Sequence, residues 1–365
     1  MSKNVSILGT RGIPAKYGGF ETFAQRLALY LVSKGWKVTV YCQSENKTGE
    51  EFWHGVKLVH VSVPKVTPLT SIVFDWKSMV KAASDEGMIL VLGYNTAIFS
   101  FWCRLKGKIT VMNMDGLEWK RQKWKLWQKI WLYVNEKCGC WLANHLIADH
   151  PEIKAYLSTM TNAQKISIIP YGAEPILLVD VKILEPYHLL PNQYILLIAR
   201  PEPENSILEI VSAFSRKRRG FKLVVLGRYV PEDFAYHKKV LESASEEVLF
   251  TGAIYERPIV DALRFYTRLY IHGHQVGGTN PSLVEALSAG SPVLAHQNPF
   301  NGWVAGQKAH YFKGEEDCAK ELEQLLNDDQ ELERMKKASF QRYHQDFANQ
   351  TDLQAYEDLF RSFVS

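Results

Sequence analysis

The 365-residue sequence lacks the features that mark several large protein classes. No apolar run reaches the ~18–20 residues that a membrane-spanning helix requires. The five cysteines show neither zinc-site nor disulfide-framework spacing, and the C-x-C formed by Cys138 and Cys140 is only a weak indication of metal binding. No D-x-D motif, internal repeat or low-complexity segment is present. We therefore expect neither a bound metal nor another cofactor.

The excess of charge is also small. Lysine and arginine outnumber aspartate and glutamate by 43 to 39, a formal net charge of +4, so any basic partner surface must be local and nucleic acid is not an expected partner. The N-terminus passes almost directly into a strand pattern, without a signal-peptide pattern before it. Together with the cysteine usage, this predicts a protein of the reducing cytoplasm.

What the sequence does contain is alternation of short apolar strands with helical patterns, in two series. The first series has strands near Val5–Leu8, Lys37–Cys42, Lys57–Val61, Met88–Leu92, Lys108–Asn113, Leu146–Ala148 and Ile166–Ile169, with helices near Phe20–Lys34, Ser71–Ala83 and Leu117–Lys137. After a Pro/Gly-containing linker at Pro170–Val181, the second has strands near Tyr194–Ala199, Lys222–Leu226, Val248–Phe250, Leu269–His272 and Pro292–Ala295. The tail, Gln330–Ser365, is helical in pattern.

This alternation predicts an α/β protein with two Rossmann-like parallel-sheet domains facing a cleft. We place the first domain at residues 1–172, the second at 173–345 and a C-terminal helix at 346–365. The C-terminal helices are expected to pack back toward the first domain. Ligands are expected at the carboxyl ends of the strands.

The most informative segment is HGHQVGGTNPSLVEALSAGSPVL, from His272 to Leu294. A strand leads into a glycine-rich turn and a helix that begins near Pro281, so free backbone N–H groups and a helix N-terminus are offered to an anion. Glu285 lies about one turn into that helix, where it could bind ligand hydroxyls or merely favour the helix dipole. His272 and His274 lie on the same side of the chain, facing either the ligand or the core. The pairing of anion and hydroxyl sites suits a sugar phosphate.

Two other strand ends carry candidate binding residues. The first strand runs into a long loop, residues 9–21, in which Arg11 and Lys16 add positive charge and a glycine pair meets the next helix; the alternative is a flexible surface loop. Arg200, at a strand end, can grip a diphosphate or can pair with Glu202 or Glu204.

Asp115 also follows a strand of the first domain. It can bind an acceptor hydroxyl, or it can cap the helix that follows.

The helix expected over Leu117–Lys137 is rich in tryptophan. Trp124, Trp127, Trp131 and Val134 fall on one helical stripe, and Arg121, Lys125 and Lys129 form an adjacent basic stripe. Tryptophan favours the membrane–water interface, and lysine and arginine favour anionic headgroups. We expect a membrane-facing helix, although most apolar helix faces pack into a core.

Five motifs carry a resemblance to a known family: GTRGIPAKYGGFET, NMDGLEWKRQKW, ARPEPENS, FTGAIYERPIVDALR and HGHQVGGTNPSLVEA. They resemble the bacterial rhamnosyltransferase group within retaining glycosyltransferase family 4, which has the GT-B fold. The motifs span both domains in order. The resemblance implies transfer of L-rhamnose from dTDP-L-rhamnose to a lipid-linked sugar of the undecaprenyl diphosphate type, during synthesis of surface polysaccharide. It implies a cytoplasmic protein held peripherally at the inner face of the cell membrane.

The resemblance also assigns roles to individual positions. Arg200 matches a diphosphate-binding arginine, and Glu285 matches the second glutamate of the family's E-x7-E pattern, which usually holds the ribose. The candidate catalytic residues are Asp115, Arg200 and Glu285. The expected donor-binding residues are Gly18, Gly19, Arg200, Asn205, His274, Gly277, Gly278, Thr279, Asn280, Ser282 and Glu285. The expected acceptor-side or loop residues are Arg11, Lys16, Glu21 and Asp115.

The sequence departs from the family pattern at two positions. Gly277 replaces the first glutamate of E-x7-E, and Asn205 replaces a phosphate-binding lysine. The turn at Thr279 and Asn280, with His274, is the candidate for holding the sugar ring, and Arg11 or Arg228 for supplying the missing charge. Other readings are a GT-B enzyme with a UDP-sugar donor, a sugar nucleotide epimerase, and a non-catalytic sugar nucleotide-binding subunit.

Overall fold

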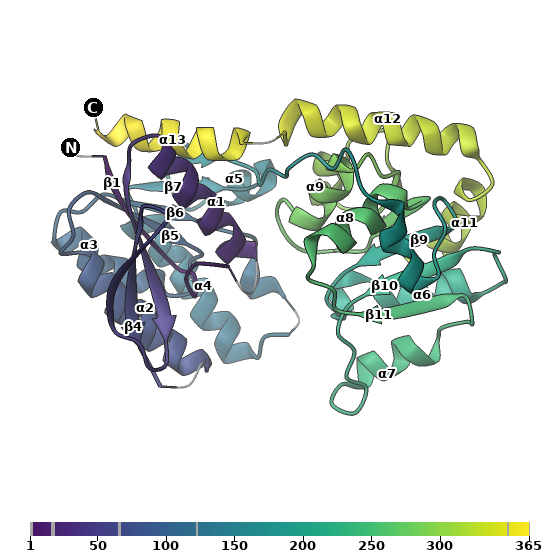
Figure 1. Cartoon of the computed structure of the whole chain (residues 1–365). Coiled ribbons are helices and arrows are strands. Elements are labelled where there is room, and N and C mark those ends of the chain that lie inside the picture. The colour runs from purple at the N-terminus through teal and green to yellow at the C-terminus, as the bar shows by residue number, and fades with distance from the viewer. Residues whose placement is uncertain (1–2, 16–18, 65–66, 122, 349, 365) are drawn as a thin grey trace. The chain divides into compact units, whose positions relative to one another are not determined.

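The structure is a computed structural model that describes residues 3–15, 19–64, 67–121, 123–348 and 350–364 (Figure 1). The chain forms two compact units. Unit 1 comprises Met1–Lys120, Trp124–Pro170 and Asp352–Ser365, and unit 2 comprises Arg121–Lys123 and Tyr171–Thr351. Each unit is a sheet covered by helices, as predicted.

Unit 1 contains an eight-stranded sheet in which all strands except β3 run parallel to their neighbours. The order across the sheet is β3 (Gly49–Trp53), β4 (Val56–Ser62), β2 (Lys37–Ser44), β1 (Asn4–Leu8), β5 (Met88–Leu92), β6 (Thr110–Asn113), β7 (His145–Ala148) and β8 (Ile166–Ile168). Its helices are α1 (Gly19–Ser33), α2 (Pro68–Ala82), α3 (Ser100–Leu105), α4 (Leu126–Leu142), α5 (Pro151–Leu157) and α13 (Thr351–Val364). Short 3-10 turns are η1 (Ala97–Phe99), η2 (Glu118–Lys120) and η3 (Ala163–Lys165). The central strand β5, MILVL, is buried at every residue, as expected for a strand covered on both faces.

Unit 2 contains a six-stranded parallel sheet. Its order is β11 (Val248–Gly252), β10 (Lys222–Leu226), β9 (Tyr194–Ile198), β12 (Leu269–His272), β13 (Val293–His296) and β14 (His310–Phe312). Its helices are α6 (Ile207–Ser215), α7 (Ala235–Glu242), α8 (Arg257–Tyr266), α9 (Pro281–Ser288), α10 (Pro299–Ala305), α11 (Glu315–Leu325) and α12 (Asp329–Asp346), with 3-10 turns η4 (Val181–Tyr187) and η5 (Pro203–Asn205). Separate hydrophobic clusters lie on the two faces of the sheet.

The C-terminal helix α13 returns to unit 1, as predicted, and packs against α1 (Figure 1). Tyr356 packs its ring 5.0 Å from Phe23 and accepts a hydrogen bond of 2.7 Å from the Asn113 amide. Trp36 of unit 1 packs against Phe360 and donates its indole N–H to Glu357. The last helix therefore completes the core of the first unit.

Some sequence expectations about elements were wrong. Strands β3 and β14 were not predicted; β3 reads GEEFW and pairs antiparallel at the sheet edge, where one apolar face is not required. The tail, by contrast, is helical as expected and forms α12 and α13. The helix expected to begin at Leu117 begins at Leu126, because Lys125 is extended and η2 occupies part of the preceding segment.

Candidate functional site

Strand order places a switch point in each unit. In unit 2 the chain builds outward from β9 through β10 to β11, then crosses to β12 on the other side of β9 and builds outward to β14. In unit 1 the corresponding pair is β1 and β5. Ligands in open α/β sheets bind outside the carboxyl ends of the strands at such a point. The loop with Arg200 follows β9 and the glycine-rich turn follows β12, so both flank the switch point of unit 2.

The loop after β9 is held by hydrogen bonds within the loop, including one from a side chain and one from the backbone. The Asn205 amide donates to the Arg200 carbonyl oxygen at 2.8 Å, and the Glu202 N–H donates to the same oxygen at 2.7 Å. The Arg200 side chain is exposed, and within the described residues it forms no ion pair with Glu202 or Glu204. The alternative of an internally paired Arg200 therefore does not apply, whereas Asn205 shapes the loop.

Glu204 lies on this loop with its carboxylate buried and neither oxygen hydrogen-bonded in the described structure. Burial, reinforced by the charge of Glu202, raises the pKa of Glu204. A buried polar group without a partner is costly, so such groups mark positions worth a functional explanation. From the sequence alone, Glu204 was expected only as a possible partner of Arg200.

The turn after β12 is locked against the loop after β9. A Cβ atom on Gly273 would lie 2.1 Å from the Asn205 carbonyl oxygen, so only glycine allows this approach. The Gln275 N–H donates to the Glu204 carbonyl oxygen at 2.9 Å, and the Gln275 side chain donates to the Ser206 hydroxyl at 2.9 Å. The two loops therefore form one structural unit at the carboxyl edge.

The two histidines of the turn stack on each other. The rings of His272 and His274 are 4.3 Å apart with an interplanar angle of 11°. Both ring nitrogens of His272, and Nδ1 of His274, are buried without a hydrogen-bond partner in the described structure. Burial and the positive charge of Arg200 lower the pKa of His274 to about 3, so its imidazole is neutral near pH 7. His272 is wholly buried and takes the core position, while His274 lies close enough to Arg200 to sense its charge.

The helix α9 begins at the end of the turn. Asn280 caps it, because its side-chain oxygen accepts the Ser282 N–H at 3.0 Å, and Thr279 is buried. The Ser282 hydroxyl lies 2.8 Å from the Tyr270 hydroxyl and faces into the unit. Of the turn residues named from the sequence, Asn280 and Ser282 thus have structural partners that set the helix start.

Glu285 is held by Arg264, which was not among the site residues predicted from the sequence. Arg264, from α8, lies 2.5 Å from Glu285 Oε2 and donates to Ser282 at 3.2 Å. The Arg264 side chain is 5% exposed, whereas that of Glu285 is 43% exposed. The buried Arg264 thus fixes one side of the Glu285 carboxylate, while the other side stays exposed and open to a ligand. Arg264 stands in the motif FTGAIYERPIVDALR, but only the fold brings it to Glu285.

The backbone conformation at Gly277 favours glycine. Its φ of 153° is one that residues with a side chain rarely adopt, and no heavy atom lies within 4 Å of a Cβ built there. Gly278 follows it in the same turn. A glutamate at this position, as in the wider family pattern, would therefore have to adopt a strained backbone conformation.

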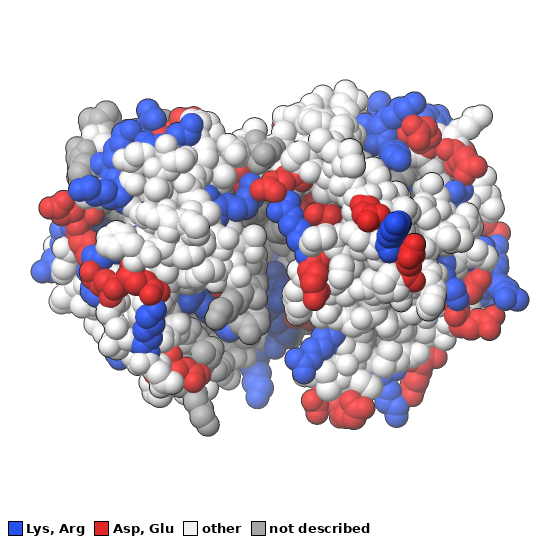
Figure 2. All heavy atoms as spheres, viewed as in Figure 1, with Lys and Arg blue, Asp and Glu red and all other residues white. Residues whose placement is uncertain are grey.

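Arg228 follows β10, the neighbour of β9, and its side chain is exposed. Gly227, beside it, lies against the loop after β9: a Cβ there would be 2.7 Å from the Ala199 carbonyl oxygen. Arg228 and Arg200 thus follow adjacent parallel strands at the same edge. Figure 2 shows acidic and basic side chains interspersed over the visible face of unit 2, so a cationic site there is local.

In unit 1 the loop after β1 is tied to α1. Glu21 accepts the Arg11 backbone N–H at 3.2 Å, and Gln25 accepts the Ala15 N–H at 2.7 Å. The Arg11 side chain is exposed, and Gly19 has open space where a side chain would stand. Glu21 therefore acts on the loop. Lys16 and Gly18 lie outside the described residues.

Asp115 follows β6 with a φ of 49°, a left-handed conformation that aspartate tolerates better than most residues. Its N–H donates to the Asn113 side-chain oxygen at 2.8 Å. Helix α4 has Lys125 at its N-cap, so Asp115 does not cap that helix. Strained backbone of this kind clusters at functional sites.

The tryptophan stripe is not continuous. Trp124, like Arg121 and Lys125, precedes α4, and its indole N–H donates to Glu118 at 3.0 Å. Trp131 donates to the Asn95 carbonyl oxygen at 2.9 Å, whereas Trp127 is 65% exposed. Only part of the expected stripe is therefore directed outward. Lys129 lies within α4 and is half-buried.

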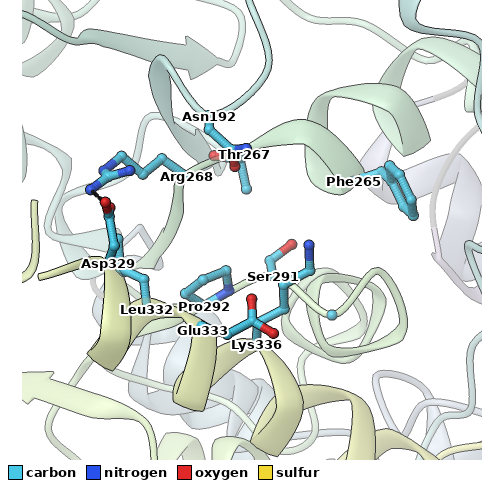
Figure 3. A pocket seen from close by; sticks show the side chains of 11 residues that line it. Asn192, Phe265, Thr267, Arg268, Ser291, Pro292, Asp329, Leu332, Glu333 and Lys336 are labelled. Carbon is cyan, nitrogen blue, oxygen red and sulfur yellow. Dashed lines mark hydrogen bonds and ion pairs between the residues drawn. The ribbon is translucent and has the colours of Figure 1, made fainter.

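A hollow of about 290 Å³ lies elsewhere in unit 2 (Figure 3). It is lined by residues that precede β12 and β13, including Arg268 and Pro292, and by α12, where Asp329 pairs with Arg268 at 2.5 Å. It therefore opens at the amino edge of the sheet, opposite the edge that carries Arg200, and we do not assign it to the same site.

Among the described residues, no group of histidine, cysteine, aspartate and glutamate has the arrangement of a metal site. Within the same residues, no helix combines the length and the apolar character needed to traverse a bilayer.

Comparisons with known proteins follow this division of the chain. Residues 2–174 match the family described as "Domain of unknown function (DUF1972)", and residues 188–342 match "Glycosyl transferases group 1". No curated protein matches the sequence.

Solved structures match over the whole chain. Sucrose-phosphate synthase from Thermosynechococcus elongatus has a TM-score of 0.83 at 16% identity, covering 99% of each chain. HepE from Anabaena, in complex with UDP and glucose, has a TM-score of 0.78 at 14% identity, covering 98% of this chain and 99% of that one. A UDP-forming α,α-trehalose-phosphate synthase from Burkholderia xenovorans has a TM-score of 0.75 at 12% identity, covering 98% and 100%.

At these identities the structures confirm the fold, and the family match covers the unit that carries Arg200 and Glu285. The expected GT-B architecture is thus confirmed, while the rhamnosyltransferase subgroup stays a prediction. Residues 188–342 thus match the group 1 glycosyl transferases, and the whole chain has the fold of the GT-B glycosyltransferases.

Proposed function

We propose that this protein transfers L-rhamnose from dTDP-L-rhamnose, with retention of configuration, to a lipid-linked sugar of the undecaprenyl diphosphate type. It would do so at the inner face of the cell membrane, in the synthesis of a surface polysaccharide. Support for the donor and acceptor comes from the five motifs that resemble the rhamnosyltransferase group, which occur in both halves of the chain.

The observation that carries a sugar nucleotide donor is the pairing of Arg200 with the Arg264-held Glu285 beside one switch point. Arg200 is an exposed cation whose guanidinium suits a diphosphate, and the open face of Glu285 suits sugar hydroxyls. The loops that present them are bonded to each other through Gln275. An anion and a polyol would thus bind at one preorganised edge of the sheet.

The proposed mechanism requires stabilisation of the leaving diphosphate. Arg200 would neutralise its developing charge, and the N–H groups of the turn at residues 277–280 and the start of α9 would add hydrogen bonds. The departing phosphate oxygen would help to remove the acceptor proton, on the same face of the sugar. Asp115 would bind an acceptor hydroxyl. No metal enters this scheme.

A second donor class has specific support. Two similar structures of Anabaena HepE contain UDP, one of them with glucose, and the trehalose-phosphate synthase from Burkholderia xenovorans is UDP-forming. A UDP-sugar donor would use the same Arg200 and Glu285. The two donors differ in the nucleotide base and in the sugar, but both would be bound by the same residues at the carboxyl edge of the sheet.

Thermal shift with dTDP-L-rhamnose, UDP-glucose and GDP-mannose separates these donors, because a ligand stabilises the native state by RT ln(1 + [L]/Kd). We expect dTDP-L-rhamnose to raise Tm most, and Arg200→Ala to remove the shift. A larger shift with UDP-glucose would refute the rhamnose donor and leave the glycosyltransferase. A matched variant, Arg218→Ala at an 82% exposed position of unit 2, should keep the shift.

Transfer to a lipid-linked acceptor is then measured, and the product's anomeric configuration is assigned by NMR. Retention supports the proposal; inversion would contradict it. Activity that disappears with EDTA and returns with Mn²⁺ would overturn the metal-free mechanism. Release of a rearranged sugar without acceptor would instead indicate an epimerase, and donor binding without any turnover would indicate a binding subunit.

A further inference from the structure

Exposed apolar side chains are concentrated on one part of unit 1. Of the twenty large apolar side chains that are exposed among the described residues, twelve belong to α2, η1, α3 and α4. Soluble proteins rarely leave contiguous apolar surface open, so such a concentration marks an interaction site. This distribution exceeds the single tryptophan stripe expected from the sequence.

Each of the three helices presents an outward apolar stripe. On α2 the exposed residues are Leu69, Val73 and Trp76, spaced at helical intervals. On α3 they are Phe101 and Leu105, one turn apart. Each of these stripes is too small to form a strong interaction site alone. Whether they form a larger site depends on whether they lie next to one another.

The stripe on α4 is the longest of the three. It includes Leu126, Trp127 and Ile130 in its first turns, and Trp141 near its end. Leu126 is 74% exposed and Trp141 is 71% exposed. Leu126 and Trp127 are more exposed than Trp131, whose indole is bound to Asn95, so the outward stripe is displaced from the one read in the sequence.

These helices pack side by side within unit 1. Helix α2 contacts η1 and α3, and α4 contacts η1 and α3. The ring of Trp76 lies 5.2 Å from that of Phe99 and 6.2 Å from that of Trp102. Successive right-handed crossovers in one direction along a sheet, from β4 through β5 and β6 to β7, place their helices on the same face. The stripes therefore join into one surface, here called the α2–α4 face.

The outward-facing charges of this region are mainly positive. Lys106, Lys125, Lys129 and Lys137 form no ion pair within the described residues. By contrast, Asp75 of α2 is turned inward onto Thr96 at 2.9 Å, and Glu136 of α4 is buried against Trp119 and Tyr156.

Burial raises the pKa of Asp75 to about 6, which fits a carboxyl withdrawn from water. Glu118, between η2 and the start of α4, accepts the Trp124 indole N–H at 3.0 Å. The lysines in α4 and at the ends of α3 and α4 thus present positive charge beside the apolar stripes, while the carboxylates of α2 and α4 face the protein.

We propose that the α2–α4 face docks unit 1 onto an anionic phospholipid bilayer. Apolar and indole side chains would enter the headgroup boundary, and the lysines would bind lipid phosphates. A protein partner would need a complementary acidic surface and fixed hydrogen-bond pairing, whereas the α2–α4 face offers distributed lysine charge around aromatic and aliphatic side chains. The purpose of this docking, though not its structural basis, rests on the proposed transfer to a lipid-linked acceptor.

Vesicle co-sedimentation tests the proposal with the full chain. The wild type should bind vesicles of phosphatidylcholine with phosphatidylglycerol, bind pure phosphatidylcholine more weakly, and lose affinity as salt screens the lysines. The double variant Leu126→Glu/Trp127→Glu should bind at least about tenfold more weakly. Leu178→Glu, at a 96% exposed position of unit 2, is the matched control and should bind like the wild type.

The lysines are tested separately. Lys129→Gln/Lys137→Gln should weaken binding to the anionic vesicles by about tenfold or more, and Lys238→Gln/Lys239→Gln on α7 should not. Circular dichroism melts check that each variant is folded, which is expected because the changed side chains lie at the surface. Unchanged binding of the Leu126→Glu/Trp127→Glu variant would overturn the proposal.

Two further outcomes are informative. If the wild type ignores anionic vesicles and sediments as a dimer that Leu126→Glu/Trp127→Glu dissociates, a second copy covers the face and the proposal is wrong. Thermal shift with donor and transfer to a water-soluble acceptor report the proposed function independently. A Leu126→Glu/Trp127→Glu variant that keeps both and loses vesicles confirms docking, whereas vesicle binding without transfer would sink only the function.

Discussion

The guanidinium of Arg264 lies 2.5 Å from Oε2 of Glu285 and also binds the Ser282 hydroxyl, joining α8 to the first turns of α9. Arg264 is almost fully buried, so its positive charge needs this carboxylate as a partner, while Glu285 keeps one side open. An arginine fork fixes the plane of a carboxylate in a way that lysine cannot. We infer that Arg264 positions Glu285.

Removing that support should weaken donor binding. We expect Arg264→Met to raise the donor Kd about tenfold and to lower the free energy of unfolding by about 1–3 kcal/mol, because Ser282 and Glu285 lose a charged donor. Arg257→Met on the same helix is the matched control: Arg257 is 58% exposed and pairs with Glu174 and Asp261. Thermal shift with donor and urea unfolding are the measurements; an unchanged donor Kd in Arg264→Met would remove the positioning role.

Arg200 is expected to act on the leaving group. Arg200→Ala should reduce kcat/KM by about a hundredfold or more, since a preorganised charge facing a developing anion is worth several kcal/mol. Its stability should stay within about 0.5 kcal/mol of wild type, because the side chain is exposed and forms no ion pair with Glu202 or Glu204. Steady-state kinetics with Arg218→Ala in parallel decides the matter; equal losses in both variants would show that general positive charge suffices.

Gly273 is predicted to be intolerant of any side chain. Gly273→Ala places a Cβ atom 2.1 Å from the Asn205 carbonyl oxygen, so the two site loops must separate, which we expect to cost about 2 kcal/mol or more and to abolish the donor thermal shift. Gly302→Ala on α10 has open space and should be neutral or slightly stabilising. If both alanine variants bind donor alike, the two loops are not a single rigid element.

Restoring the missing family glutamate should not improve the enzyme. Gly277→Glu puts a side chain on backbone with φ near 153°, which we expect to cost about 1–2 kcal/mol and to lower activity. Gly314→Glu, at an extended position with open space around it, controls for added charge and bulk. A gain in kcat/KM for Gly277→Glu would show that the turn adapts freely.

The histidine stack should make the protein acid-sensitive. The pKa of His274 is about 3 in the folded state against 6.5 for an unperturbed histidine, so below pH 6.5 the unfolded chain takes up a proton that the folded chain refuses. The free energy of unfolding should fall by up to about 1.4 kcal/mol per pH unit between these values. His274→Gln should reduce that slope, while His344→Gln, exposed on α12, should not. Urea titrations at stepped pH test this, and identical slopes for all three proteins would contradict it.

Helix α13 should be required for unit 1 to fold. Tyr356→Phe removes the acceptor of the Asn113 amide in a fully buried position and should cost about 1–3 kcal/mol, and Tyr356→Ala about 3–5 kcal/mol. Asp358→Ala, at an exposed position of the same helix, is the control. Thermal melts measure the differences; full stability after deletion of α13 would mean that the helix is an accessory.

Periodicity alone predicted most of the architecture, because parallel strands buried on both faces are continuous apolar runs such as MILVL at β5. It missed β3, whose polar edge sequence carries no such signal, and placed the start of α4 too early. The early start of α4 matters because it placed Trp124 on the helix. In the structure Trp124 precedes α4 and donates its indole N–H to Glu118, so it does not belong to the helical stripe. Residue types showed that the region is aromatic and basic, but not which side chains face outward.

By itself, the sequence determined the α/β class, the return of the C-terminal helices, and the strand-end motifs that contain Arg200, Glu285 and the glycine-rich turn. These depend on local pattern, which short-range propensity and burial dictate. Only the tertiary structure decided that Arg264 holds Glu285, that Gly273 lets two loops meet, and that three helices share one apolar face. Such relationships join residues far apart in the chain, and their geometry follows from sheet order and helix packing, which no local pattern encodes.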